Sequence, residues 1–210
     1  MKNILLIGDS IRAGYDKTVR KTLEGIANVY FPEDNCKFAA YTLRYLHEYK
    51  NALIPEGNVD IIHWNAGLWD CLRLFGEDPH TPLDIYAYYI DRICIRIKKL
   101  YPEAQVIFAT STSVLSEKMD PNFKRYNEEI EAYNAAAVEI VKKYGFEVND
   151  LYAASKALPE EAHSDAVHYY TPMGTEAFAN QVLRCLAPAL GLEEVPAYKE
   201  ELHTDKPVGI

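Results

Sequence analysis

Three segments of the sequence carry side chains whose types and spacing suit nucleophilic chemistry. Ser10 ends the tripeptide Gly8-Asp9-Ser10, directly after an apolar run over 4–7. Asp165-Ala166-Val167-His168 pairs a carboxylate with an imidazole three residues later. Asn65-Ala66-Gly67-Leu68-Trp69-Asp70 carries an amide side chain and an indole. A hydroxyl, a base with a carboxylate, and hydrogen-bond donors are the components of a serine hydrolase.

The roles follow from the chemistry of each side chain. A serine hydroxyl is a weak nucleophile until a base accepts its proton, and histidine suits this because its ordinary pKa is about 6.5. A carboxylate that accepts the other ring N–H holds the imidazole in one tautomer. We therefore expect Ser10 to be the nucleophile, His168 the base and Asp165 the group that orients it. The oxyanion of the tetrahedral intermediate then needs donors, each worth about 3–4 kcal/mol.

The elements that must position these residues alternate along the chain. Short apolar runs predict five strands, over 4–7, 29–31, 60–66, 106–109 and 146–148. Caps, terminators and three- and four-residue spacing predict helices over 17–27, 38–49, 83–100, 120–145 and 171–191, two of which open on Asp120-Pro121 and Thr171-Pro172. Strands separated by helices pair in parallel. The expected fold class is therefore α/β, a three-layer α/β/α sandwich around a five-stranded parallel sheet.

This architecture explains how distant residues can meet. In an open parallel sheet, ligands bind beyond the carboxyl ends of the strands. The loops after the first, third and fifth strands hold Ser10, the 65–70 segment and the 165–168 segment. We therefore expect the candidate residues to converge on one edge of the sheet.

Length and composition limit the remaining possibilities. The chain has 210 residues, so at about 150 residues per domain we expect one domain over 1–191, followed by a surface tail over 192–210. With 22 basic against 31 acidic residues, the formal net charge is −9. Nucleic acid and anionic membranes are therefore not expected partners, because both need a basic face.

Cysteine use and hydropathy bear on the compartment. No apolar run approaches the roughly 20 residues of a membrane span. The four cysteines stand far apart, without metal-ligand spacing. We read them as reduced thiols, and therefore expect a cytoplasmic protein.

Taken together, the motifs resemble those of the SGNH, or GDSL-type, esterases. The first block of that family matches Gly8-Asp9-Ser10, and its D-x-x-H block matches Asp165 and His168, followed by Gly174 in the last predicted helix. Its third block, G-x-N-D, aligns without gaps with residues 67–70. The resemblance covers roughly residues 1–190. It implies a flavodoxin-like strand order, 2-1-3-4-5, and hydrolysis of a small-molecule ester, with no metal ion and no cofactor.

Two positions depart from the family pattern. Where the third block of the family has an asparagine that binds the oxyanion, this chain has Trp69, which is either an indole donor or a pocket wall. Asn65, two residues before Gly67, is the other candidate donor, in an N-x-G-L-x-D pattern that resembles a less-characterised branch of the family. The second block lacks its glycine, and the stretch around Cys36 takes its place as the source of a backbone N–H.

Two other polar residues have structural interpretations. Arg12 follows the candidate nucleophile closely, and a solvated surface charge is the favoured interpretation over a contact to substrate. His63 stands on an otherwise apolar strand and is expected to be a hydrogen-bonded core histidine.

The favoured function is a serine esterase acting on a carbohydrate O-acetyl ester through an acyl-enzyme on Ser10. A lysophospholipase, a thioesterase and an acyltransferase would use the same residues, so the sequence leaves them open. A non-catalytic module that binds a carbohydrate or acyl group is the alternative from another class. The sequence also leaves the oligomeric state open.

Overall fold

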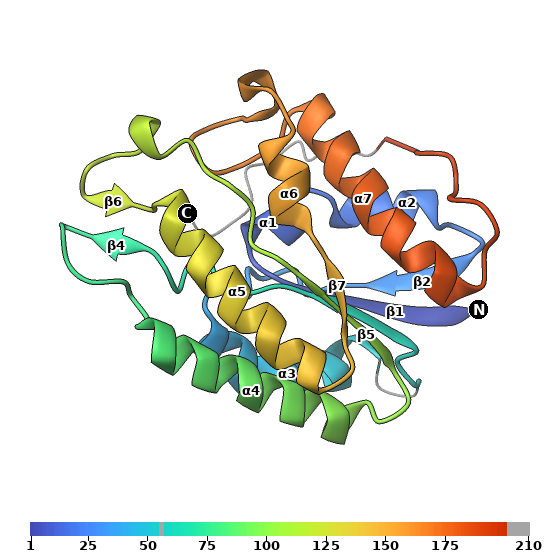
Figure 1. The fold of residues 1–210 in the computed structure, drawn as a ribbon. Helices are drawn as coiled ribbons and strands as arrows, with labels where there is room; N and C mark the ends of the chain where they lie inside the picture. Colours follow the sequence, from blue (N-terminus) through green and yellow to red (C-terminus); the bar gives the residue numbers. More distant parts are fainter. Residues whose placement is uncertain (55–56, 201–210) are drawn as a thin grey trace.

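A five-stranded parallel sheet runs through the centre of the computed structural model, which describes residues 1–54 and 57–200 (Figure 1). Its strands are β1 (Lys2–Ile7), β2 (Ala27–Tyr30), β3 (Ile61–Trp64), β5 (Gln105–Ala109) and β7 (Glu147–Asn149). They lie in the order β2-β1-β3-β5-β7, and all neighbouring pairs are parallel. Counted among the sheet's own strands, this is the order 2-1-3-4-5, so the predicted topology is confirmed.

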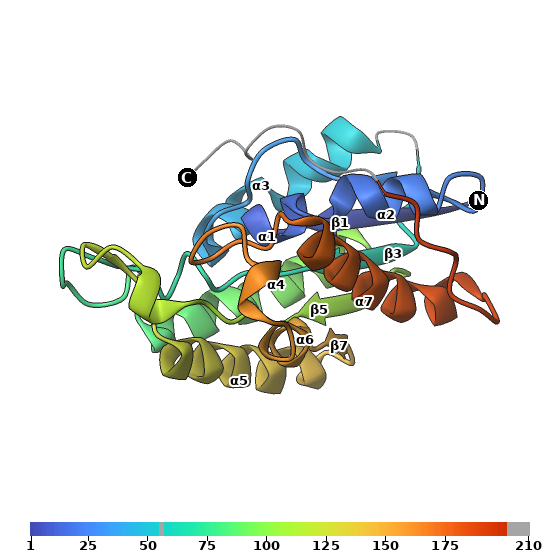
Figure 2. The same cartoon turned by 90° about the horizontal axis from the view of Figure 1, so that it is seen from above.

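Helices cover both faces of the sheet and complete the three layers (Figures 1 and 2). On one face, α4 (Leu83–Leu100) packs between α3 (Ala39–Leu53) and α5 (Asn127–Lys143). On the other, α7 (Pro172–Leu190) packs against α2 (Asp16–Thr22) and α6 (Leu151–Lys156), and the short α1 (Ser10–Ala13) precedes α2. The predicted sandwich is therefore the observed one.

The central strands are apolar because helices bury them on both sides. Residues 4–7 of β1 have no exposed surface, and β3 is buried throughout. A continuous apolar run, rather than alternation, is the sequence pattern of such strands. The helices contribute single apolar stripes, such as Tyr86, Ile90, Ile93 and Ile97 of α4.

Several short elements have no counterpart among the sequence predictions. β4 (Arg73–Leu74) and β6 (Phe123–Lys124) form a two-stranded antiparallel sheet beyond the carboxyl ends of the main strands (Figure 1). One-turn 3₁₀ helices lie at Ser116–Lys118 and Glu160–Ala162. Elements of two to six residues show no measurable period, so hydrophobic patterning could not reveal them.

Two predicted helix boundaries are wrong. The helix expected over 17–27 ends at Thr22, because the chain enters β2 at Ala27. The helix expected to open on Asp120-Pro121 begins only at Asn127, after β6. Asn127 marks this start with its amide, which donates to Val114 O at 2.9 Å and accepts from Val114 N at 3.0 Å. Tertiary pairing thus overrides the local capping signal.

Arg12 is buried, which corrects the expectation of a solvated charge. Its Nη1 donates to Asp16 Oδ2 at 2.5 Å and to Pro32 O at 2.8 Å, and its Nη2 donates to Asp34 O at 2.7 Å. Burial opposes its charge, but the neighbouring Asp16 outweighs this and raises the pKa of Arg12. Arg12 therefore ties α1, α2 and the loop after β2 together, close to the predicted nucleophile.

The segment predicted as a tail lies partly against the domain. Residues 192–200 form no helix or strand, yet Lys199 N donates to Thr22 Oγ1 at 3.0 Å and Tyr198 packs against the core. Residues 201–210 of the predicted tail lie outside the described residues.

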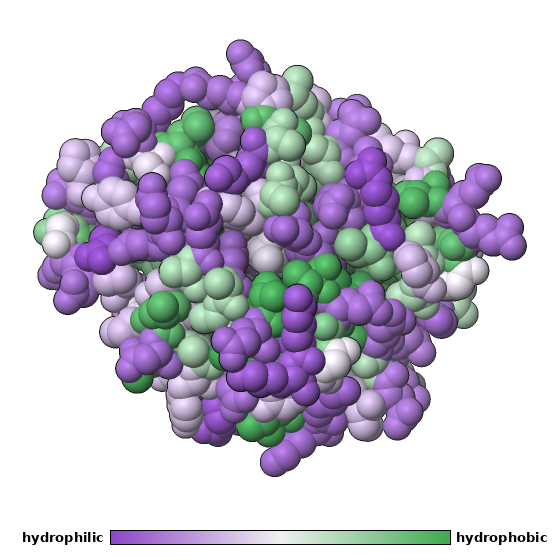
Figure 3. All heavy atoms as spheres, in the orientation of Figure 1, coloured by the Kyte–Doolittle hydropathy of each residue, from purple (hydrophilic) through white to green (hydrophobic). Residues whose placement is uncertain are grey.

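The outer surface is mainly hydrophilic on the face drawn in Figure 3, with separate hydrophobic patches between the charged side chains. None of the helices in the described part of the chain combines the length and apolarity needed to cross a bilayer.

Arg12→Met should lower the free energy of unfolding by about 3–5 kcal/mol, because it removes one partner of a buried ion pair. Arg44→Met is the matched control, since Arg44 forms the same i,i+4 pair with Glu48 on an exposed surface, where such pairs are worth less than about 0.5 kcal/mol. Urea denaturation followed by circular dichroism measures both. Similar losses for the two variants would contradict the bracing role of Arg12.

Candidate active site

Ser10 is the first residue of α1 and follows the carboxyl end of β1 within three residues. Asp9 caps this helix, since its Oδ1 accepts from Ile11 N at 3.0 Å. The first amides of a helix have no acceptor inside it. The cap therefore satisfies Ile11 and leaves the backbone N–H of Ser10 without an intrahelical partner, next to its own hydroxyl.

Gly8 allows the loop after β3 (residues 65–70, the third loop) to approach the loop after β1 that carries Ser10 (residues 8–10, the nucleophile loop). A Cβ at this position would lie 1.9 Å from Asn65 Oδ1 and 2.8 Å from Arg12 Cβ. A side chain at position 8 would therefore push apart the two loops that follow β1 and β3.

Asp165 and His168 form one rigid unit. The Asp165 Oδ1 accepts from Val167 N at 2.8 Å and from His168 N at 2.9 Å. The imidazole Nδ1 lies 2.8 Å from Asp165 Oδ2. Partial burial disfavours the charge of Asp165, but the hydrogen bonds from the His168 ring and the two amides outweigh it and hold its pKa well below the usual range. Asp165 therefore stays ionised and can accept from the ring.

The structure brings Ser10, Asp165 and His168 together as predicted. His168 Nε2 lies 2.8 Å from Ser10 Oγ, across 158 positions of sequence. Because Nδ1 faces the carboxylate, the tautomer protonated at Nδ1 leaves Nε2 as an acceptor toward the hydroxyl. The geometry is that of a nucleophile, a base and an orienting carboxylate.

Tyr170 holds two members of this group and was missed by the sequence analysis. Its ring stacks on His168, with centroids 4.8 Å apart and 21° between the planes. Its hydroxyl donates to Ser10 O at 2.6 Å. No motif marked this residue, although it stands only two positions after His168.

The Ser10 hydroxyl opens on a pocket of about 390 Å³. Its walls are largely apolar, formed by Leu68, Trp69, Met119, Phe123, Ala166 and Val167. Most ligand pockets combine such walls with a few polar groups. Here the polar groups include the three candidate catalytic residues.

The candidates of the third loop are distributed unevenly around this pocket. Trp69 lines it, whereas Asn65 and Gly67 are not part of its lining. The amide of buried Asn65 lies beside the carboxyl of Asp9 and favours its charged form. Gly67 has a φ of +149°, and a Cβ there would lie 2.5 Å from Ser111 Oγ. Gly67 therefore shapes the loop, and Trp69 presents a side chain to the pocket.

Cys36 does not offer its amide to the pocket, which corrects the expectation for the second loop. Its N–H donates to Gly8 O at 3.1 Å, so this donor is already used. Lys37 takes the left-handed backbone conformation, with a φ of +48°, and its N–H donates to Asn35 Oδ1 at 2.8 Å. Both amides therefore already have acceptors within the protein.

Arg125 is the second residue that the sequence analysis missed. It follows β6 directly, lines the pocket with Ser10, and is only 3% exposed. Its Nε donates to Leu68 O at 2.5 Å. The helix predicted to start at Asp120 hid this position, because an arginine inside a helix reads as a surface charge.

Asp70 connects the third loop to the start of α3. Both carboxyl oxygens accept from Ala39 N, at 3.2 and 3.0 Å, at the first turn of α3. Burial raises its pKa to about 7, although the hydrogen bonds from Ala39 and Thr81 oppose the shift. Phe38, the residue before α3, provides no side-chain cap, so Asp70 takes that role from another element.

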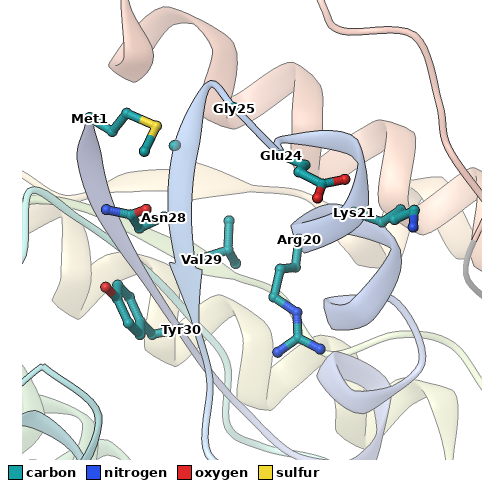
Figure 4. A pocket seen from close by; sticks show the side chains of 9 residues that line it. Met1, Arg20, Lys21, Glu24, Gly25, Asn28, Val29 and Tyr30 are labelled. Carbon is teal, nitrogen blue, oxygen red and sulfur yellow. The ribbon is translucent and has the colours of Figure 1, made fainter.

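A second hollow, of about 440 Å³, lies away from these residues at the edge of the sheet along β2 (Figure 4). Its lining includes Met1, Arg20, Glu24 and Asn28. No serine, histidine or cysteine lines it, so it lacks a nucleophile–base pair. Within residues 1–54 and 57–200, no three histidine, cysteine or acidic side chains are grouped to hold a metal ion.

Solved structures share this fold. A lipase/acylhydrolase from Enterococcus faecalis is 19% identical, with a TM-score of 0.67 over 96% of this chain and 100% of its own. A GDSL-like lipase from Bacteroides thetaiotaomicron is 16% identical, with a TM-score of 0.69 over 90% of this chain and 89% of its own. The acetylxylan esterase Axe2 from Geobacillus stearothermophilus is 19% identical, with a TM-score of 0.67 over 91% of this chain and 95% of its own. No protein-family model and no curated protein sequence matches the chain.

The raised pKa of Asp70 predicts a pH dependence of stability. The folded state holds a proton on Asp70 up to about pH 7, whereas an unfolded aspartate loses it near 3.8. The resulting stabilisation is complete below the unfolded pKa and is lost as the pH rises through 7. Between pH 5 and pH 8 the wild type should lose about 2 kcal/mol of unfolding free energy that Asp70→Asn does not lose.

Urea denaturation of both proteins at pH 5 and pH 8 measures this difference. All other titrating groups are common to the two proteins and cancel. Parallel pH dependences would show that Asp70 is ionised throughout.

Proposed function

We propose that this protein is a serine esterase of the SGNH, or GDSL-type, family that hydrolyses a small-molecule ester through an acyl-enzyme on Ser10. The observation that carries the proposal is the 2.8 Å contact between Ser10 Oγ and His168 Nε2, with Asp165 on the opposite ring nitrogen. The shared fold of a lipase/acylhydrolase and an acetylxylan esterase supports it.

In the first half-reaction, Ser10 Oγ attacks the ester carbonyl carbon while its proton passes to His168 Nε2. The imidazolium that forms is stabilised by the ionised Asp165. When the tetrahedral intermediate collapses, the C–O bond to the alcohol breaks and His168 protonates the leaving oxygen. In the second half-reaction, water loses a proton to His168 and attacks the acyl carbon. The bond from this carbon to Ser10 Oγ then breaks, His168 returns the proton to Ser10 Oγ, and the acid leaves.

The oxyanion of each tetrahedral intermediate needs donors close to Ser10. The backbone N–H of Ser10 fits this role, because the helix start leaves it without an intrahelical acceptor. Trp69 lines the pocket and carries an indole N–H, so it is the side chain we assign beside it. Asn65 lies beside Asp9 on the nucleophile loop, and its amide is the alternative side-chain donor.

We infer an O-acetyl ester of a carbohydrate as the substrate class. The acetylxylan esterase named above acts, as its name says, on such an ester and has the same fold. The pocket volume suits a small acyl group together with part of a sugar. Lysophospholipid and thioester hydrolysis and acyl transfer would use the same three residues, and the length of the preferred acyl chain separates the first of these from acetyl esters.

Hydrolysis of 4-nitrophenyl acetate and of longer 4-nitrophenyl esters by the wild type and Ser10→Ala tests the proposal. Ser10→Ala should lose at least about 10³-fold in kcat, because the nucleophile is gone and the pocket alone provides only residual catalysis. Ser116→Ala, at a serine outside the pocket, is the control and should keep full activity. Equal rates for wild type and Ser10→Ala would reject the esterase and favour the binding module.

A further inference from the structure

A buried guanidinium in the wall of the catalytic pocket has no assigned function. Only 3% of the surface of Arg125 is exposed, and this residue lines the same pocket as Ser10. Its Nε donates to Leu68 O. Within residues 1–54 and 57–200, neither Nη group has a hydrogen-bond acceptor, and no carboxylate lies within 4 Å of the guanidinium.

This arrangement differs from that of the other buried arginine. Arg12 has an ion pair with Asp16 and two carbonyl acceptors, which compensate for the burial of its charge. Arg125 has a single carbonyl and an aromatic ring, Phe123, whose centroid lies 5.2 Å from its Cζ. Asp9 and Asp165 act on Arg125 from a distance, but a buried cation without a contact ion pair is costly unless a ligand supplies one. The unsatisfied donors of Arg125 are therefore a candidate anion site.

The other charged groups around the pocket form no contact ion pair with Arg125, although the carboxyls of Asp9 and Asp165 lie near enough to favour its charge. Lys118 is exposed and forms an ion pair with Glu160. Asp120 lies in an exposed turn, where its Oδ1 accepts from Asn122 N at 2.7 Å. Asp165 is engaged by His168. Arg125 is thus the one buried cation of the pocket lining, among apolar walls that exclude water.

We propose that Arg125 is a specificity residue that binds a carboxylate on the ester substrate. A guanidinium presents parallel N–H donors that match the two oxygens of a carboxylate, and such charge-assisted pairs are strong where water is excluded. This proposal rests on the proposed esterase function and narrows its substrate class to esters that carry an anionic group. The Nε–Leu68 bond fixes the guanidinium to the loop after β3 at the wall of the pocket.

Two pairs of esters test the preference and locate the charge. On the alcohol side, 4-acetoxybenzoate is compared with its neutral methyl ester. On the acyl side, 4-nitrophenyl hemisuccinate is compared with 4-nitrophenyl butyrate. The wild type should show a higher kcat/KM for the anionic member of one pair, and the pair that shows it identifies the side of the ester that faces Arg125.

Arg125→Gln should lower kcat/KM for that anionic ester by about 10- to 100-fold, mainly through KM, while the neutral ester changes less than about threefold. Arg125→Lys should retain part of the preference, since it keeps the charge without the planar fork. Arg73→Gln is the matched control, because Arg73 lies on the paired strand β4 but is neutralised by Glu129 outside the pocket. It should leave the preference unchanged.

Equal losses on anionic and neutral esters in Arg125→Gln would overturn the proposal and place Arg125 at the oxyanion or in support of the third loop. No loss on either member would overturn it as well. A change in thermal unfolding that accompanies equal losses would identify the supporting role.

Binding measurements separate this proposal from the esterase itself. Isothermal titration of Ser10→Ala with 4-hydroxybenzoate and with succinate reports anion binding without turnover. One of them should bind to Ser10→Ala and lose that affinity in Ser10→Ala/Arg125→Gln. If Ser10 proves not to be the nucleophile, this difference still decides the role of Arg125; binding that is equal in the two proteins would contradict it.

Discussion

The contact between Ser10 Oγ and His168 Nε2 depends on nearly every feature of the fold. The two residues lie 158 positions apart, on the loop after the first strand and the loop before the last helix. The parallel sheet brings these loops to one edge, and the order β2-β1-β3-β5-β7 places the loop after β3 next to them. A separation of 2.8 Å tolerates little displacement, because proton transfer requires hydrogen-bond reach.

Buried polar groups hold this edge of the sheet in place. Arg12 forms an ion pair with Asp16 and donates hydrogen bonds to carbonyls of the loop after β2. Asp70 accepts a hydrogen bond from the first amide of α3. Burial raises the pKa of Asp9, and the nearby Asn65 amide and the hydrogen bond from Ile11 N oppose the shift. Each of these groups joins two elements. Moving either element would leave a buried polar group without its partner, and this penalty holds the loops that carry the site in place. The Nη groups of Arg125 keep unused donors at the pocket wall, which is the pattern of a group that binds substrate.

The sequence predicted the sheet and the convergence of Ser10, Asp165 and His168, because both depend on strong local patterns. Apolar runs marked each strand, and Asp165 and His168 are adjacent on one turn. The sequence did not predict what tertiary pairing decides: β6 displaced the expected helix start at Asp120, and this hid Arg125. Arg12 looked like a surface charge, since burial of a long charged side chain has no local signature beyond its i,i+4 spacing to Asp16.

The reactivity of Ser10 can be measured directly with a fluorophosphonate, whose phosphorus an activated serine oxygen attacks while fluoride leaves. Intact-protein and peptide mass spectrometry report how many adducts form and where. An activated Ser10 predicts one adduct, on Ser10, formed rapidly in the wild type and at least about 10²-fold more slowly in His168→Ala, which lacks the base. Labelling of other serines, or equal rates in the two proteins, would contradict the proposed role of the Ser10–His168 pair.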